Sequence, residues 1–416
     1  MPTVFQPLES PQFRKYFGAA VLSALGDGMQ MIAMSWFLYQ RTGSVASISL
    51  VLVVQTLPGL LLSPLAGALV DRSRPQWTCV AADVVQGLVL CALVLAIYVD
   101  QWVLPAIYLA SLLMAVCRLF SLPALGALVR DISTRESLLS ANILSSTTLQ
   151  IGMLCGASAG GFLVAQIGAM NVILANAMSF FVSAVFIAWV RVQAREPRAP
   201  AATGVPLTQE LREALVYARR HPFILWLTLV DIFDTMAINM FNALLPAFVS
   251  RELGGGPQDF GLIEGAWGGG ALLGGILLSY VVRRVDQHRI SVAGPACLSV
   301  LILFFLAAQT TAHAMAGYFV LGIFVCAVGI NTNALLAAEV KPAYFGKIKS
   351  FIYMCTSYAG LAVYGILSLV GDRVSPRWIF ASVSALVMTG FLWKLWRLWR
   401  ARQAQTGTAE AAAPTE

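Results

Sequence analysis

The chain has 416 residues, of which 58% are hydrophobic and only 11% are charged. A soluble domain carries about 25% charged residues, so this composition excludes a water-soluble globule and predicts a lipid bilayer as the solvent. The net charge of +7 comes from short clusters between apolar runs, and this distribution argues against a nucleic-acid partner.

Twelve apolar runs follow one another along the chain. Each is long enough to cross the hydrocarbon core of a bilayer as a helix, which takes about 20 residues. Several contain Gly or Pro, which spanning helices tolerate where neighbouring helices satisfy the backbone. The predicted spans are roughly 15–40, 45–70, 77–99, 103–127, 138–166, 170–191, 223–249, 259–282, 289–310, 313–337, 348–371 and 376–397.

The basic residues predict how these spans are oriented. With the N-terminus on the cytoplasmic side, 22 of the 27 Lys and Arg residues fall in cytoplasmic segments, and Arg118 lies within a span. The remaining four are Arg41, Arg251, Arg373 and Arg377, which fall in outer loops. Because Lys and Arg are enriched in cytoplasmic loops, both termini are predicted to be cytoplasmic.

The longest internal loop divides the chain into two halves. Residues 1–191 are predicted to form an N-terminal six-helix bundle and 223–397 a C-terminal one. Residues 192–222 form a cytoplasmic linker, in which Leu207 to Arg220 has the apolar spacing of an amphipathic surface helix. Residues 398–416 are predicted to be a disordered tail.

The two halves contain matching residues at a constant offset. Asp27 and Asp234 are 207 positions apart, and so are Gly67 and Gly274. Two halves related by an axis along the membrane normal are typical of transporters whose substrate site lies between the halves near mid-membrane.

Ionisable residues inside spans are costly, and each is therefore a candidate for function. Asp27 lies between Gly26 and Gly28 and is a candidate proton-carrying or cation-binding group; the alternative is a structural ion pair. Asp231 and Asp234 lie three positions apart on one helix face, where one of them can hold a proton. Asp231 can instead lie in interfacial water at the helix end.

Arg118 does not deprotonate in proteins, so it needs a partner or water. We expect its partner to be Asp27, and the alternative is an Arg that extends to the cytoplasmic surface. Asp83 is expected near the cytoplasmic end of its helix, facing Arg72 or Arg74 in a gating contact. The amide side chains of Gln30, Asn239 and Asn242 are expected to line the cavity, although helix packing would also explain each of them.

Two segments resemble motifs of the major facilitator superfamily. Gly67, Asp71, Arg72 and Arg74 resemble its signature loop between the second and third spans, with Ser73 and Pro75 where a second Gly is usual. The resemblance implies a latch on the cytoplasmic side. The fifth span resembles the superfamily's antiporter motif, with Ala157 in place of its usual Pro; its glycines, which allow close helix packing, are Gly152, Gly156, Gly160 and Gly161.

The start of the chain resembles the macrolide-efflux and enterobactin-exporter branch. The residues that carry this likeness are Ser23, Gly26, Asp27, Gly28, Trp36, Thr42, Gly43, Ser44 and the segment from Ser137 to Asn142. The resemblance implies an all-α fold of twelve transmembrane helices in two pseudo-symmetric bundles. It also implies secondary active export of drugs or siderophores by alternating access with proton coupling. A lysophospholipid flippase of the same superfamily is the alternative.

An enzyme is not expected, since no HExxH motif and no CxxC pair occurs. No Walker A motif is present, so the proton gradient is the expected energy source and no cofactor or metal is expected. The expected partners are a small-molecule substrate and the lipid bilayer, without nucleic acid, and the chain is expected to be monomeric. The expected location is the inner (cytoplasmic) membrane of a bacterium.

Overall fold

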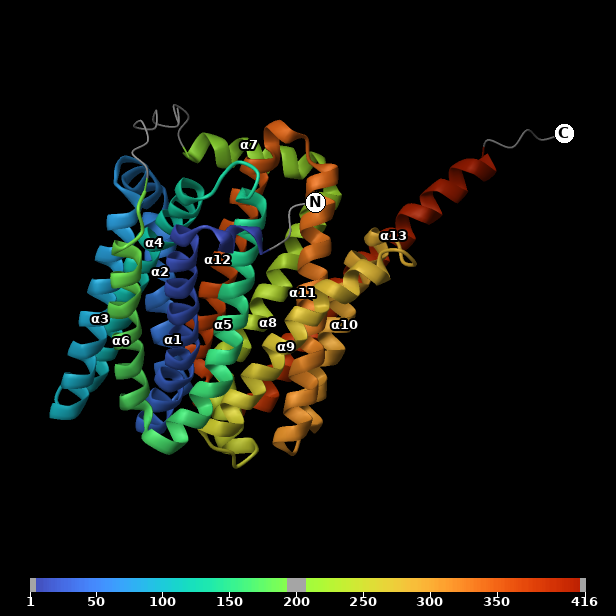
Figure 1. Cartoon of the computed structure of the whole chain (residues 1–416). Helices are drawn as coiled ribbons and strands as arrows, with labels where there is room; N and C mark the ends of the chain where they lie inside the picture. The colour runs from blue at the N-terminus through green and yellow to red at the C-terminus, as the bar shows by residue number, and fades with distance from the viewer. Residues whose placement is uncertain (1–4, 193–206, 412–416) are drawn as a thin grey trace.

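The structure, a computed structural model, describes residues 5–192 and 207–411, and the regular elements in these ranges are helices (Figure 1). Twelve of these helices are long and apolar enough to cross a membrane, which confirms the predicted spans. In chain order the elements are η1 (Gln6–Glu9), α1 (Pro11–Thr42), α2 (Val45–Arg72), α3 (Pro75–Val99), α4 (Val103–Ile132), α5 (Leu138–Ile167), α6 (Ala169–Ala188), α7 (Leu207–Arg220), α8 (Pro222–Glu252), α9 (Pro257–Val281), α10 (Gln287–Ala307), α11 (Thr311–Glu339), α12 (Pro342–Val370) and α13 (Pro376–Ala411).

Proline and glycine set several of the helix ends. A proline in the first turn loses no hydrogen bond and has the backbone angle that a helix needs. Helix α1 ends at Gly43, whose φ of 61° is in the left-handed region that favours glycine. The Ser44 hydroxyl then accepts a hydrogen bond from the Ser47 N–H and caps α2. The helices that begin with proline include α3, α8, α9, α12 and α13, at Pro75, Pro222, Pro257, Pro342 and Pro376.

The same packing order occurs in both halves. In the N-terminal half α1 packs on α5 and α6, α3 packs on α4 and α6, and α2 packs on α4. In the C-terminal half α8 packs on α12 and α13, α10 packs on α11 and α13, and α9 packs on α11. Each pairing maps onto its counterpart when α1–α6 are matched with α8–α13. The chain is therefore two pseudo-symmetric six-helix bundles, as the 207-residue offset predicted.

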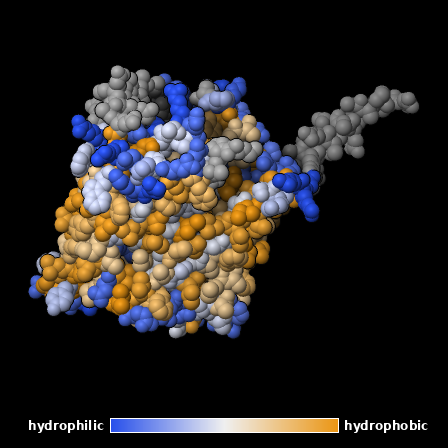
Figure 2. Space-filling model, in the orientation of Figure 1, coloured by the Kyte–Doolittle hydropathy of each residue, from blue (hydrophilic) through white to orange (hydrophobic). Residues whose placement is uncertain are grey.

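The helix ends lie on two faces of the molecule. We name the one that carries the start of α1, together with α7, the terminal face (Figure 1). The other end, with the α1–α2 turn and the α12–α13 loop, is the opposite face. Figure 2 shows a broad hydrophobic band between two hydrophilic ends, which is the surface expected of a protein that spans a bilayer.

The two halves meet along two equivalent seams, α5 against α9 and α2 against α12. Trp36 on α1 also stacks on Phe260 on α9, with 6.2 Å between ring centroids. Among the described residues, the hydrogen bonds that join one bundle to the other all lie at the opposite face. The halves are therefore fastened together at that face.

Helix α7 occupies the predicted residues and packs on protein through one face. Ala214, Tyr217 and Ala218 are buried in a cluster with the ends of α8, α11 and α12. The predicted apolar face was defined by Leu207, Leu211, Leu215 and Ala218. Of these, Ala218 is buried and Leu215 is half-buried, while the side chains of Leu207 and Leu211 lie outside the described part.

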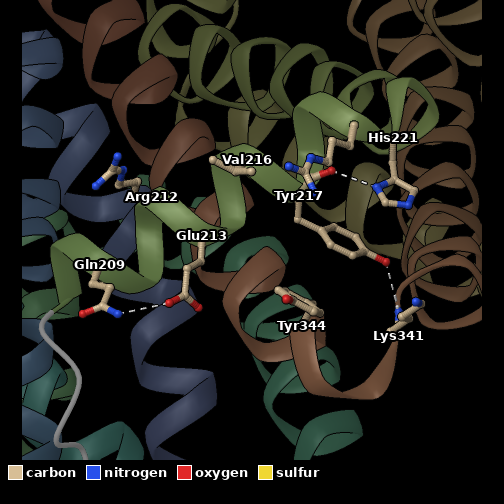
Figure 3. A pocket seen from close by; sticks show the side chains of 9 residues that line it. Gln209, Arg212, Glu213, Val216, Tyr217, His221, Lys341 and Tyr344 are labelled. Atoms are coloured by element: carbon tan, nitrogen blue, oxygen red, sulfur yellow. Dashed lines mark hydrogen bonds between the residues drawn. The ribbon is translucent and has the colours of Figure 1, made fainter.

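An ion pair and an aromatic stack attach α7 to α12 beside a cavity of about 810 Å³ (Figure 3). The Lys347 ammonium donates to Glu213 at 2.5 Å. Tyr217 stacks on Tyr344 with 4.6 Å between centroids. The helix is thus tied to the C-terminal half.

The end of the chain differs from the prediction. Helix α13 continues to Ala411, although a disordered tail was predicted from residue 398. Near the predicted end of the span, Arg397 lies over the Trp393 ring and Arg400 over the Trp396 ring. Tryptophan and arginine are typical anchors at a membrane interface, so the span itself ends where it was predicted.

Candidate functional site

Asp27 lies in the middle of α1 between two glycines that are each covered by another helix. A Cβ atom on Gly26 would collide with the Asn176 side chain on α6, and one on Gly28 would collide with the Met153 carbonyl oxygen on α5. The glycines therefore allow α5 and α6 to hold this turn of α1 on both sides. The Asp27 side chain keeps 17% of its surface exposed.

The predicted partner of Arg118 is confirmed. Its Nη2 atom on α4 lies 3.6 Å from Oδ2 of Asp27 on α1, so the ion pair joins two helices of the N-terminal half. Arg118 remains 46% exposed although it lies in the membrane-spanning part of α4 and points toward α1. A partly exposed ion pair at this depth needs an aqueous or polar space beside it.

The C-terminal half carries a second charged cluster. Asp234 is 8% exposed, and its Oδ2 atom has no hydrogen-bond partner among the described residues. Asp231 is half-buried and interacts electrostatically with Lys349 on α12, which in turn donates to the Asn333 side chain on α11. Asp231 therefore has an exposed cation, Lys349, in its electrostatic surroundings.

Sequence reasoning missed Lys349 because it counted this residue with the cytoplasmic basic residues, although it lies at the edge of the predicted span that began at 348. Helix α12 begins at Pro342 and includes Lys349 in its third turn. Pro342 is the signal that would have found it, since proline often opens a helix.

The predicted cavity amides make contacts within each half. Asn176 donates to the Gln30 side chain and joins α6 to α1. The Tyr364 hydroxyl on α12 donates to Oδ1 of Asn239 at 2.8 Å, and Asn242 is a second hydrogen-bond partner of that hydroxyl. These contacts hold helices together, and contact of Gln30, Asn239 or Asn242 with a substrate stays a prediction.

The glycines of α5 face two different neighbours. A Cβ on Gly152 would lie 2.5 Å from the Ala24 Cβ, and one on Gly160 would lie 2.8 Å from the Met29 Cα, both on α1. A Cβ on Gly156 would likewise collide with α1, at the Leu25 carbonyl oxygen. A Cβ on Gly161 would instead lie 2.5 Å from the Pro257 carbonyl oxygen on α9, in the other half. Three glycines thus compact the N-terminal bundle, and Gly161 sets the approach of the two halves.

The predicted cytoplasmic gate is only partly described. The side chains at 67, 71 and 72 lie outside the described part, so Gly67, Asp71 and Arg72 stay predictions, and Arg74 is exposed at the turn before α3. Asp83 was expected to face Arg72 or Arg74; no ion pair joins it to Arg74, and a contact with Arg72 stays a prediction because that side chain lies outside the described part. Asp83 is buried and accepts a 2.6 Å hydrogen bond from the Ser183 hydroxyl on α6.

The opposite face carries contacts that sequence reasoning also missed. Asp372, in the α12–α13 loop, accepts hydrogen bonds at 2.6 Å from both the Ser44 hydroxyl and the Val45 N–H. The Arg251 guanidinium at the end of α8 donates to the Gly43 carbonyl oxygen. We call these residues the opposite-face latch, because each contact joins one half to the other.

Comparison with known proteins agrees with this architecture. The transmembrane secretion effector family matches residues 2–413, almost the whole chain. The chain belongs to this family of the major facilitator superfamily. Its members and relatives are transporters of the major facilitator superfamily and not enzymes.

Several curated relatives cover nearly the whole chain. Macrolide efflux protein A of Streptococcus pyogenes is 21% identical over 91% of this chain and 93% of its own length. The uncharacterised transporter YfiS of Bacillus subtilis is 25% identical over 91% and 92%. Multidrug efflux pump Tap of Mycolicibacterium fortuitum is 26% identical over 65% and 67%.

Solved structures share the fold at low sequence identity. The nucleoside transporter NupG has a TM-score of 0.70 at 14% identity and covers 92% of this chain and 98% of its own. A bacterial homologue of the iron transporter ferroportin, solved in an inward-facing state, has a TM-score of 0.73 at 14% identity, with 92% and 98% covered. The secretion effector is thus a multi-pass membrane protein with the major facilitator fold.

Proposed function

We propose that this secretion effector is a proton-coupled exporter of amphiphilic small molecules, drugs in particular. The observation that carries the proposal is the exposed Asp27–Arg118 pair at mid-membrane. The names of the relatives, a macrolide efflux protein and a multidrug efflux pump, favour drugs as the substrate class. Siderophore export is a narrower form of this proposal, with siderophores as the exported molecules.

The orientation we propose follows the basic residues. The four residues predicted to lie in outer loops belong to helix ends and loops of the opposite face, namely Arg41, Arg251, Arg373 and Arg377. Apart from Arg118 within α4, the other described Lys and Arg residues lie toward the terminal face. By the positive-inside rule the terminal face is cytoplasmic, with both termini in the cytoplasm of a bacterium and the chain in its inner membrane.

In this orientation the latched opposite face is the outer gate, and the described conformation is inward-facing. A substrate enters from the cytoplasm or the inner leaflet and reaches the space beside Asp27. Release to the outside requires the latch at Asp372 and Arg251 to open and the terminal face to close. This is alternating access between two halves, as expected of the fold.

Proton coupling is proposed through a change in the Asp27–Arg118 pair. A proton on Asp27 removes its negative charge, so Arg118 loses its partner and becomes available to other acceptors or to water. The free energy of the pair therefore depends on the proton, which is what couples proton movement to a conformational change. Asp234 is proposed to carry a second proton, since its buried carboxyl group has no described cation within ion-pair distance.

The test is drug accumulation in a bacterial strain that lacks its own efflux pumps. Cells that express the chain are expected to accumulate less of a radiolabelled macrolide and of a fluorescent amphiphilic cation, and a protonophore is expected to restore accumulation. The Gly18→Ala variant is a control, because nothing lies within 4 Å of a Cβ at that position. Unchanged accumulation of both probes, together with uptake of labelled lysophospholipid into spheroplasts, would favour the flippase instead.

A further inference from the structure

Asp83 is one of the residues that line a recess inside the N-terminal half. The recess has a volume of about 190 Å³ and is lined by α1, α3, α4, α5 and α6. Leu122, Asn142, Ser146 and Leu149 are exposed and form its rim. Its floor is formed by buried residues, namely Cys79, Asp83, Ser183 and Ile187. The recess therefore extends from accessible surface on α4 and α5 to a buried carboxyl group.

The recess is lined by groups that hydrogen-bond water. Between rim and floor lie the buried hydroxyls of Ser121 and Ser145, together with those of Tyr16 and Ser23 on α1. A cavity of this size holds several water molecules, each of which needs two to four polar partners. The recess thus contains hydrogen-bonding groups for water beside Asp83.

Among the described residues, Asp83 has no cation as an ion-pair partner. Its side chain is 7% exposed, and none of the described Lys, Arg or His residues lies within ion-pair distance of it. The Ser183 hydroxyl donates to Oδ2, which leaves Oδ1 as the free oxygen. An isolated buried carboxylate costs several kcal/mol, and it avoids this cost by taking up a proton.

The titratable groups near Asp83 add no positive charge. They are Cys79 on α3, Tyr16 and Asp27 on α1, and Cys117 on α4. The residues of α5 and α6 that line the recess carry hydroxyl, amide or apolar side chains.

We propose that Asp83 and the recess form a further proton-binding site, inside the N-terminal half and separate from both the Asp27–Arg118 pair and Asp234. Oδ1 of Asp83 takes a proton from water in the recess and returns it there. The site is occupied at neutral pH, while Ser183 fixes the orientation of the carboxyl group. It does not depend on the identity of the exported molecule.

Infrared difference spectroscopy of the purified full-length protein in lipid nanodiscs tests this site without any transport assay. A protonated carboxyl group gives a carbonyl stretch that a carboxylate lacks. At neutral pH the Asp83→Asn variant is expected to lose one such band relative to the wild type. The Ser183→Ala variant is expected to keep that band at a higher frequency, since its carbonyl oxygen loses a hydrogen bond. Asp27→Asn is expected to retain the band whose frequency changes in Ser183→Ala, because that band belongs to Asp83.

Two results would overturn the proposal. If Asp83→Asn folds, as judged by size-exclusion chromatography, and loses no band, Asp83 is ionised in the wild type. If the wild-type band arises only after Na⁺ and K⁺ are removed, the recess holds a metal cation and not a proton. If Asp27→Asn loses drug export but keeps the Asp83 band, the proton site at Asp83 is supported independently of the proposed role of Asp27 in transport.

Discussion

Asp372 accepts a hydrogen bond from the backbone N–H of Val45 at 2.6 Å, so a loop of the C-terminal half caps the first turn of α2 in the N-terminal half. Its other carboxylate oxygen accepts the Ser44 hydroxyl. A carboxylate at a helix N-terminus is stabilised by the unpaired N–H groups and by the helix dipole. This contact forms only when the opposite face is closed, and it therefore stabilises that conformation specifically.

The Asp372→Asn variant is expected to open the opposite face more often. Loss of the charge weakens the cap by about 1–2 kcal/mol, which is roughly a 5- to 30-fold change in the equilibrium between the two conformations. Spin labels on Asn171 and Ala312, which are exposed on different halves of this face, are expected to show a larger population of long distances. Asp100→Asn is the matched control, because Asp100 pairs with Arg41 within one half. Equal distance distributions in the two variants would contradict a latch role for Asp372.

The Gly161→Ala variant is expected to hold the halves apart at the α5–α9 seam. The new methyl group would lie 2.5 Å from the Pro257 carbonyl oxygen, and overpacking of this kind costs about 1–3 kcal/mol. The same pair of spin labels is expected to report loss of the closed opposite face. Gly126→Ala, with nothing within 4 Å of its added Cβ, is expected to leave the distances unchanged. If the opposite face stays closed in Gly161→Ala, the α5–α9 seam accommodates the added methyl group, and the prediction is wrong.

The attachment of α7 to α12 is expected to weaken in acid. The hydrogen bond from Lys347, and then that from Gln209, lowers the pKa of Glu213 below its ordinary value of 4.5. A lowered pKa in the attached state means that the attachment is fully stabilised above pH 4.5 and loses this stabilisation as the pH falls through the lowered value. A spin label at the exposed Val216 is expected to become more mobile over that range.

The control for this prediction is Glu213→Gln, which removes the titrating group. Its label is expected to be mobile already at neutral pH and insensitive to acid. Gln209→Ala removes only the lesser hydrogen bond and is expected to keep the pH dependence. Acid-induced mobility that persists in Glu213→Gln would assign the effect to another group.

Much of the architecture followed from the sequence, because hydropathy and charge are local signals. The twelve runs predicted the spans, and α7 begins and ends at the residues that the amphipathic spacing predicted. The Asp27–Arg118 pair was predicted because a charge in a span needs a partner and few partners exist.

The contacts that escaped prediction are long-range. Arg251 and Gly43 are 208 positions apart, and Asp372 and Val45 are 327 apart. Loop residues of this kind are polar in any membrane protein, so their composition carries no sign of a partner. Asp83 shows the same limit, since the charge of Arg74 suggested a partner nearby in sequence, whereas the fold supplies Ser183 from α6.

The measurement that tests the proposed transport mechanism most directly is macrolide uptake into proteoliposomes with an acidic interior. Molecules with the terminal face outward are expected to exchange internal protons for external labelled macrolide, and a protonophore is expected to abolish uptake. Asp27→Asn is expected to reduce the gradient-driven rate to that of protein-free vesicles. Asp100→Asn, which removes an acid at the opposite face, is expected to retain uptake. Full gradient-driven uptake by Asp27→Asn would contradict the proposal that this carboxyl group couples protons to export.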